Sequence, residues 1–418
     1  MMAPVRARRW LTIVFVALVT SGCWVEVGAN AQRTAFVAGE KTLTTTNVKS
    51  LRLAWTVKVP TQPGSPVIGN GVLFVAGGAT MTAFATQDGA QLWQTGPMSQ
   101  GSTTQMADTA IVNNKVLAPY SLFNAGGTFT FDPAKGTYTS SAVSATIPYN
   151  APVVDGKTVA MTRKEVRTDG TLSSLSYGSR VGLINFWSNS AQAVPATTPM
   201  INGHTIFVGS GTSVLAFSLD TCPASPIAGL CAPLWKKDLK STTSMPVAIS
   251  STRVAVATQV GSIFVLDAAT GAQEFVALTT SSYAQPPAID NSGLMYTATV
   301  DGVVRAFPTA GCNFPTCAAV WSSKQKGPIT TQLVTAGGVV YAGTATGRVL
   351  AFDAKGCAKP PCTWLFTVTV DSKAQRVQLI EDAGTLYAVT DTGLVSAYRP
   401  PAPPATTTTT TKATTKAS

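Results

Sequence analysis

The fold of this chain is decided by the stretch IFVLDAATGAQEF, residues 263–275. It consists of an apolar strand, a tight turn from Asp267 to Gly271, and a second strand that ends in an aromatic residue. Related stretches stand at 81–93 (MTAFATQDGAQLW) and 349–356 (VLAFDAKG). One strand-turn-strand unit that recurs along a chain is typical of repeat architectures.

The repeat has the period of a propeller blade. An aromatic residue marks the last strand of each copy, at intervals of 38 to 49 residues, and four-stranded blades recur at about this spacing. We predict an all-β chain that forms an eight-bladed β-propeller, with four antiparallel strands per blade. A seven-bladed ring is the alternative if the copy near 105–140 or 150–187 is not a blade. The aromatic positions are Trp55, Trp93, Tyr138, Trp187, Trp235, Phe275, Trp321 and Trp364.

The two ends of the repeat region complement each other. The last copy ends at Tyr398 without an aromatic strand, whereas the strand around Trp55 has no earlier strands to join. We predict that this N-terminal strand completes the last blade and closes the ring, which leaves no exposed sheet edge. The tryptophans are expected to pack between neighbouring blades rather than to form a sugar or cofactor site.

The N-terminus is typical of an export signal. A positive region (Arg6, Arg8, Arg9) precedes an apolar run at 11–19 that is too short to span a bilayer. The sequence TSGC at 20–23 is similar to a lipobox, so we predict lipidation of Cys23; cleavage near Ala29-Asn30-Ala31 is the alternative. The predicted organisation is a signal peptide at 1–22, an N-terminal linker at 23–44, a propeller at 45–399 and a disordered Pro/Thr-rich tail at 400–418.

Cysteine spacing agrees with export. Apart from Cys23, the cysteines form three close pairs, each around a small loop rich in Pro, Ala and Gly. A zinc site is the alternative, but no Cys-x-x-Cys pair is present. We therefore predict local disulfides in an oxidising compartment. The pairs are Cys222 with Cys231, Cys312 with Cys317, and Cys357 with Cys362.

Charge and histidine content exclude several function classes. The net charge of +11 falls to +6 over residues 23–400, where 25 basic residues face 19 acidic ones. No basic stripe with interleaved aromatic residues is present, so we expect no nucleic-acid partner. The single histidine, His204, follows a turn, where an exposed or hydrogen-bonded role is expected, and histidine-based metal or acid–base chemistry is excluded.

Four stretches with an Asp and Gly turn carry a family resemblance. Residues 266–275, together with FDPAKG at 131–136, FDAKG at 352–356 and DGAQLW at 88–93, resemble the tryptophan-docking repeat of the pyrroloquinoline-quinone-like propeller superfamily. The resemblance covers residues 45–399. It implies one of two classes: quinone-dependent alcohol dehydrogenases, or non-enzymatic scaffolds such as the lipoprotein subunit of the outer-membrane β-barrel assembly machinery.

The residues favour the scaffold class. If the resemblance is to the dehydrogenases, it implies a vicinal disulfide, a Ca²⁺ held by Glu and Asn, and a catalytic Asp. In this sequence no two cysteines are adjacent and no acidic cluster stands at a strand end. Asp290-Asn291 and Asp155-Gly156 are typical of turns. We predict no catalytic, cofactor-binding or metal-binding residues, and neither quinone nor calcium. The expected function is an exported, lipid-anchored scaffold that binds an envelope protein or a cell-wall glycan; the alternatives are a quinone-dependent dehydrogenase-like enzyme and a ligand-sensing propeller.

Overall fold

The structure is a computed structural model. It describes residues 24–60, 62–98, 105–106, 108–122, 125–144, 146–148, 150–156, 158–167, 170–179, 184–189, 196–220, 232–279, 281–282 and 285–401. Within these ranges the regular secondary structure consists of β-strands and one short 3₁₀ helix, η1 (Val48–Ser50). The predicted signal, Cys23, the pair Cys222–Cys231 and residues 402–418 lie outside the described residues.

The described strands form eight sheets of four or five strands, and all but two of the strand pairings are antiparallel. Short, largely buried runs of apolar residues, separated by turns with Gly and Asn at positive φ, form these hairpins. In chain order the sheets are β3 (Val67–Gly69), β4 (Val72–Gly77), β5 (Thr80–Ala85), β6 (Gln91–Gln94); β7 (Gln105–Met106), β8 (Ala110–Val112), β9 (Lys115–Leu122), β10 (Ala125–Phe131), β11 (Tyr138–Ser144); β12 (Thr146–Pro148), β13 (Val153–Asp155), β14 (Thr158–Arg167), β15 (Gly170–Ser179), β16 (Ile184–Asn189); β17 (Met200–Asn202), β18 (Thr205–Ser210), β19 (Ser213–Ser218), β20 (Trp235–Asp238); β21 (Val247–Ser250), β22 (Arg253–Ala257), β23 (Ser262–Asp267), β24 (Gln273–Leu278), β28 (Thr316–Cys317); β25 (Ala288–Ile289), β26 (Leu294–Ala298), β27 (Val304–Pro308), β29 (Trp321–Ser322); β1 (Phe36–Val37), β30 (Val334–Ala336), β31 (Val339–Gly343), β32 (Arg348–Asp353), β33 (Phe366–Thr369); and β34 (Val377–Asp382), β35 (Thr385–Thr390), β36 (Leu394–Arg399), β2 (Arg52–Lys58).

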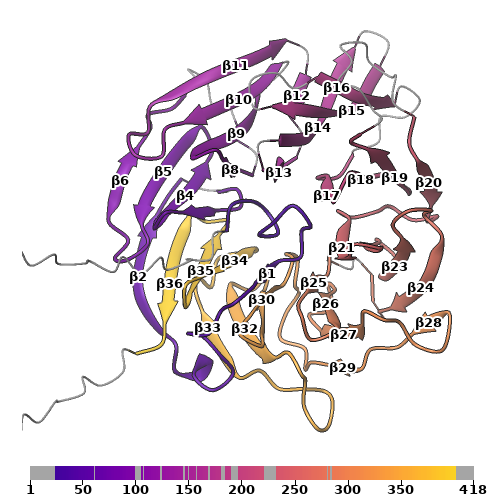
Figure 1. The fold of residues 1–418 in the computed structure, drawn as a ribbon. Helices are drawn as coiled ribbons and strands as arrows, with labels where there is room; N and C mark the ends of the chain where they lie inside the picture. Colours follow the sequence, from indigo (N-terminus) through magenta and orange to yellow (C-terminus); the bar gives the residue numbers. More distant parts are fainter. Residues whose placement is uncertain are drawn as a thin grey trace, which may run out of the picture.

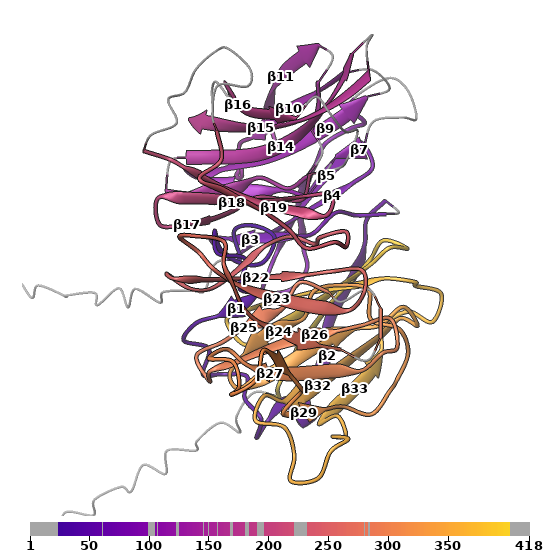
Figure 2. The same cartoon turned by 90° about the vertical axis from the view of Figure 1, so that its right-hand side faces the viewer.

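The sheets follow one another around a common centre, in propeller-like fashion (Figure 1). In the view turned by 90°, the strands of neighbouring sheets lie one above another (Figure 2). The last sheet joins the two ends of the described chain, because β2 pairs antiparallel with β36, with Trp55 opposite Ala397. This is the strand pairing that the missing aromatic strand of the last repeat predicts.

Tryptophans of the outer strands pack onto the next sheet. The indole N–H of Trp235 donates to the Ala268 carbonyl at 3.0 Å, and its ring covers Gly271. A methyl group at Gly271, where φ is +71°, would lie 2.6 Å from that ring, so only glycine fits the turn. The packing role predicted for the tryptophans is thus confirmed for four of them. The other donor–acceptor pairs are Trp55 with Thr86, Trp93 with Pro133, and Trp321 with Ala354.

The N-terminal segment 24–40, which we call the hub, bonds to the innermost strands of the sheets. Its backbone carbonyls accept one N–H from each of six sheets, at N–O distances of 2.7–3.0 Å. The third sheet donates Val154 N–H to the Glu26 carboxylate at 2.9 Å, and the eighth donates Gly384 N–H to Glu40 at 2.9 Å. The six backbone pairs are Ile68 to Trp24, Ile111 to Val25, Ile201 to Ala31, Ala248 to Gln32, Ile289 to Thr34, and Thr335 to Ala35.

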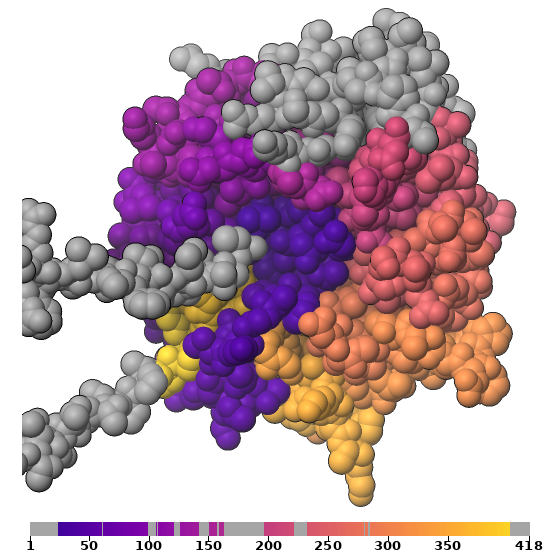
Figure 3. Space-filling view, in the orientation of Figure 1, coloured from indigo at the N-terminus to yellow at the C-terminus, as the bar shows by residue number. Residues whose placement is uncertain are grey.

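The hub therefore differs from the linker predicted for residues 23–44. Figure 3 shows atoms of the N-terminal part of the described chain (indigo) in the middle of one face of the molecule. Trp24, Glu26, Arg33 and Ala35 are buried, and Phe36–Val37 adds a parallel strand, β1, to β30. The sequence of this segment resembles that of a linker. The segment is held through its backbone carbonyls, which every residue has, so its contacts leave no pattern in the sequence.

A buried ion pair holds the hub in its bent path. The Arg33 guanidinium lies 3.5 Å from the Glu26 carboxylate, and both side chains are at most 1 % exposed. Arg33 also donates to the carbonyl of Pro152 at 2.9 Å and to that of Pro199 at 3.2 Å. These carbonyls precede β13 and β17, so one side chain links the hub to the third and fourth sheets. Removing one partner of such a pair leaves a buried charge without compensation.

Two of the predicted cysteine pairs close loops that cover a neighbouring sheet edge. Cys312 and Cys317 are paired, with Cα atoms 5.8 Å apart, and Cys357 and Cys362 are paired at 5.5 Å. The first loop supplies β28, which runs parallel to β24 of the preceding sheet. In the second, Cys362 N–H donates to the Ser322 carbonyl at 2.7 Å beside β29. Each loop thus occupies hydrogen-bonding groups that an edge strand would otherwise leave open.

Prediction on the hub. Replacement of Arg33 by methionine keeps the apolar stem but leaves Glu26 without its partner. We expect the free energy of unfolding to fall by about 3–5 kcal/mol, measured by thermal and denaturant unfolding. Lys240→Met is the control, because Lys240 forms an exposed pair with Asp238, and no measurable loss is expected there. An Arg33→Met protein as stable as the wild type would contradict the role given to the hub.

Candidate functional site

A cavity of about 270 Å³ lies against the hub near the centre of the sheets. Trp24, Val27, Gly28 and Ala35 of the hub form one side of it. The other walls come from the segments that lead into β3, β21, β25, β30 and β34, and from the first residues of those last two strands. Because contributions from five sheets meet the N-terminal segment here, the cavity depends on the hub. We call it the axial cavity.

The lining of the axial cavity is apolar with a few polar groups and one charge. Among the described residues it contains the guanidinium of Arg376, three glutamines, Ser65 and two threonines, but no carboxylate and no histidine. Arg376 donates to the Pro63 carbonyl at 2.8 Å, and Gln332 donates to two backbone carbonyls at 3.1 Å. Apolar walls with a small number of placed polar groups are the usual composition of small-molecule sites.

The lining does not fit a calcium-bound quinone. Ca²⁺ requires six to eight oxygen ligands, usually including carboxylates, and no lining residue carries a carboxylate. The nearby Asp108 accepts the backbone N–H of Ser65 and is not part of the lining. Elsewhere in the described chain, no group of three or more His, Cys, Asp or Glu side chains is arranged to hold a metal ion.

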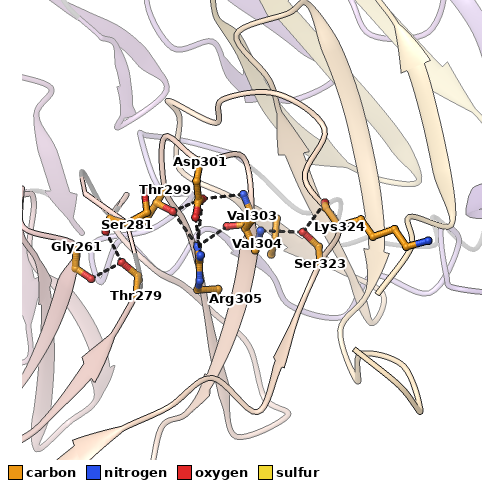
Figure 4. Close-up of polar contacts among 10 residues, drawn as sticks. All are labelled: Gly261, Thr279, Ser281, Thr299, Asp301, Val303, Val304, Arg305, Ser323 and Lys324. Atoms are coloured by element: carbon orange, nitrogen blue, oxygen red, sulfur yellow. Dashed lines mark hydrogen bonds and ion pairs between the residues drawn. The ribbon is translucent and has the colours of Figure 1, made fainter. Parts of the chain in front are cut away.

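A second arginine near the surface is already paired. Arg305 of β27 borders a groove between the fifth and sixth sheets, and its guanidinium lies 2.5 Å from the Asp301 carboxylate. It also donates to Thr299 at 2.8 Å, and the Ser323 hydroxyl binds Val304 N–H at 2.9 Å alongside (Figure 4). Since its donors serve the turn 299–303, Arg305 stabilises the sheet rather than offering a free cation.

Three carboxylates gather where the hub meets the eighth sheet. The Glu40 carboxylate accepts N–H groups from Leu43 at 2.8 Å and Gly384 at 2.9 Å, and Glu381 accepts the same Gly384 N–H at 2.9 Å. Glu381 and Asp382 are buried, and each has one carboxylate oxygen without a hydrogen-bond partner. The buried hydroxyl of Tyr341 also lacks a hydrogen-bond partner. The cluster fastens the hub and shows no acid–base pair aimed at a cavity.

Burial sets the protonation of this cluster. Burial and the neighbouring Glu40 carboxylate raise the pKa of Asp382 to about 7, and the same two causes raise the pKa of Glu381 well above its ordinary range. Burial acts to raise the pKa of Glu40 as well, but hydrogen bonds from Leu43, Glu381 and other groups lower it overall. The cluster is therefore most stable with Glu381 and Asp382 protonated beside an ionised Glu40.

The structure places the other predicted residues plainly. His204 is 81 % exposed and pairs with Asp220 at 2.8 Å, which confirms the expected turn role. Asp290 accepts the N–H of Ser292 in its turn at 2.9 Å. Sequence reasoning missed Glu26, Arg33, Glu40 and Arg376. The one available signal was the isolated pair of opposite charges at 26 and 33 within an otherwise uncharged segment.

No membrane-spanning helix is present in the part of the chain that the structure describes.

Comparisons with known proteins agree on the fold. The family model described as outer membrane protein assembly factor BamB matches residues 14–222 and 232–360. None of the curated proteins matches the chain. Among solved structures, quinohemoprotein alcohol dehydrogenase from Comamonas testosteroni is similar, with a TM-score of 0.66, 15 % identity, and coverage of 90 % of this chain and 80 % of that one.

Two further solved structures that are not named as dehydrogenases have a similar fold. BamB from Moraxella catarrhalis is similar, with a TM-score of 0.59 and 15 % identity, covering 84 % of this chain and 99 % of that one. The computationally designed Ika8 protein has a TM-score of 0.61 and 13 % identity, covering 82 % of this chain and 97 % of that one. At such identities the likeness concerns the fold alone.

Prediction on pH. Because the folded pKa of Asp382 is raised to about 7, its favourable contribution is complete below about pH 4 and is lost as the pH rises through about 7. We expect the melting temperature to fall between pH 5 and 8, and Asp382→Asn to reduce that fall. Thermal unfolding at constant ionic strength measures both.

The control for this prediction is Asp88→Asn, at an exposed turn carboxyl that accepts Ala90 N–H; it should keep the wild-type slope. An Asp382→Asn protein with the same decline as the wild type would show that the cluster does not titrate in this way.

Proposed function

The chain belongs to the family of the outer membrane protein assembly factor BamB, and on this premise we propose that it is an exported, lipid-anchored, non-catalytic β-propeller that binds a component of the bacterial envelope. The partner is an envelope protein or a cell-wall glycan. Neither a quinone nor calcium is part of the protein in this proposal. The observation that carries it is the axial cavity, whose described lining has one cation and no carboxylate.

The finer architecture belongs to the same proposal. We take the eight sheets of the described residues as eight blades, and the pairing of β2 with β36 as the closure of the ring. The hub supports this count, because it accepts at least one backbone N–H from each of the eight sheets, that of the eighth coming from Gly384 in the turn between β34 and β35. A closed ring has no sheet edge between its first and last blades, which favours a stable, monomeric platform.

Export and anchoring are supported by the hub itself. Cleavage near Ala31, the alternative to lipidation, would remove Glu26 and leave Arg33 as an uncompensated buried charge. It would also remove the carbonyls of Trp24 and Val25, which bind the first two sheets. Processing at Cys23 keeps every hub contact. The two cysteine pairs at bonding distance agree with an oxidising compartment.

Prediction on the anchor. We expect the mature protein to begin at an acylated Cys23 and to sediment with membranes, and Cys23→Ala to release it into the soluble fraction. Mass spectrometry of the mature N-terminal peptide, with fractionation of the cell envelope, measures both. A wild-type N-terminus at Gln32, or Cys23→Ala protein that stays on membranes, would refute the anchor.

A second candidate function is a quinone-dependent dehydrogenase. It is favoured by the similarity of the fold to quinohemoprotein alcohol dehydrogenase and to a europium-containing methanol dehydrogenase, with a TM-score of 0.60. The donor set of the axial cavity opposes it, since a Lewis-acid metal would lack its carboxylate ligands there.

Prediction on catalysis. Purified protein mixed with pyrroloquinoline quinone and Ca²⁺, or with a lanthanide ion, should retain no cofactor absorbance after gel filtration. It should also fail to reduce an artificial electron acceptor in the presence of alcohols. Saturable uptake of the quinone together with alcohol-dependent dye reduction would overturn the non-catalytic proposal in favour of the enzyme.

A further inference from the structure

The axial cavity has a definite chemical character. At about 270 Å³ it lies near the lower end of the ~300–1,000 Å³ usual for ligand sites, so it suits a single residue or a small organic molecule rather than a folded segment. Trp24, Met245 and Leu379 contribute apolar surface to it. An apolar portion of a ligand would be favourable against these walls.

Arg376 gives the cavity its preference for an anion. Among the described residues no carboxylate lies within ion-pair distance of its guanidinium, in contrast to Arg305, which is held by Asp301. The carboxylate of Asp391 lies near Arg376 but accepts backbone N–H groups instead of the guanidinium. These are the N–H groups of Gln375 at 3.1 Å and of Arg376 at 3.3 Å. The bond to the Pro63 carbonyl orients the guanidinium and uses only one of its five donors.

The glutamines of the lining supply acceptors. Gln378 donates through Nε2 to Ser65 at 3.2 Å, while its Oε1 is buried without a hydrogen-bond partner. Leaving such an oxygen unpaired costs free energy, and because the oxygen has almost no accessible surface, a ligand N–H recovers this cost only after the Gln378 amide turns toward the cavity. The Nε2 of Gln332 donates to two backbone carbonyls, so its side-chain oxygen is the polar atom that remains for a ligand. A ligand that carries both an anionic group and a neutral N–H therefore matches this lining.

We propose that the axial cavity binds the carboxylate end of an N-acylated amino acid, a site that deepens the proposed envelope-binding function and rests on it. The carboxylate pairs with the guanidinium of Arg376 in bidentate fashion. The amide N–H of the ligand donates to the side-chain oxygen of a glutamine in the lining, and the ligand side chain packs against Trp24 and Leu379. A free amino acid is disfavoured because its ammonium group would find no carboxylate among the lining residues.

Two sources share this chemistry. A polypeptide ends in an L-residue with an acylated nitrogen, and a cell-wall stem peptide presents a D-residue of the same kind. The two differ only in the hand of the α-carbon, so a chiral pair of probes separates them. Both sources agree with an envelope partner, and they correspond to the protein and cell-wall alternatives of the proposed function.

The experiment is a calorimetric titration of the purified mature protein with N-acetyl-L-phenylalanine, N-acetyl-L-alanine, N-acetyl-D-alanine and the corresponding primary amides. We expect saturable binding of an acid and at least tenfold weaker binding of its amide, because a charge-assisted pair is lost. Preference for an L-acid assigns the site to polypeptide ends, and preference for the D-acid assigns it to cell-wall peptides.

Variants locate the site. Arg376→Gln should weaken binding of the preferred acid at least tenfold. Gln378→Glu, which leaves the Arg376–Pro63 bond in place, should do the same by placing a carboxylate beside that of the ligand. Arg348→Gln on β32, outside the lining, is the matched control and should bind as the wild type does; melting curves establish that each variant is folded.

Absence of binding up to millimolar probe, equal affinity for acids and amides, or wild-type affinity in the folded variants would each overturn the proposal. The outcome is independent of the quinone experiment: quinone uptake with dye reduction would contradict the non-catalytic function, whereas a failed titration would remove only this ligand class.

Discussion

The structure depends on the hydrogen bonds between the hub and the inner strands of the sheets. Six inner-strand N–H groups bond to hub carbonyls, and carboxylates of Glu26 and Glu40 receive N–H groups from the remaining two sheets. An inner strand at the centre of a ring has no partner strand on its inner side, so its buried N–H groups need acceptors from elsewhere. The hub provides them, and each bond contributes about 1 kcal/mol.

This constraint also makes the axial cavity. The hub occupies the centre of the sheets with groups that are nearly all satisfied, and leaves beside it a small space with apolar walls, amides and one guanidinium. Glu26 and Arg33, the two charged side chains that fix the bend of the hub, are paired with each other and buried. The described lining of the cavity thus offers a guanidinium, amide groups and apolar walls to a ligand.

The repeat could be predicted from the sequence because it rests on side chains with strong local signals. The turn from Asp267 to Gly271 and the tryptophan at 235 appear together in several copies, and the structure joins them through an indole bond and a ring-to-glycine contact. The terminal strand around Trp55 was predictable for the same reason, as the missing member of the last copy.

The hub could not be predicted because most of its contacts use backbone carbonyls, which every residue has, and because its partners are distant in the sequence, from Ile68 for Trp24 to Gly384 for Glu40. Arg376 also carries no local signal: its significance is that no carboxylate of the described residues pairs with its guanidinium, which only the fold reveals. The pairs Cys312–Cys317 and Cys357–Cys362 could be predicted from their spacing. The position of their loops on the edge of the preceding sheet could not.

The most direct test of this account is native-state hydrogen exchange of the inner-strand N–H groups under increasing denaturant. If the hub holds all sheets together, the amides of Ile68, Ile111, Val154, Ile201, Ala248, Ile289 and Thr335 should merge into one exchange isotherm at the free energy of global unfolding. Separate isotherms, with some of these amides exchanging through local openings while others stay protected, would contradict the claim that the N-terminal segment unites the ring.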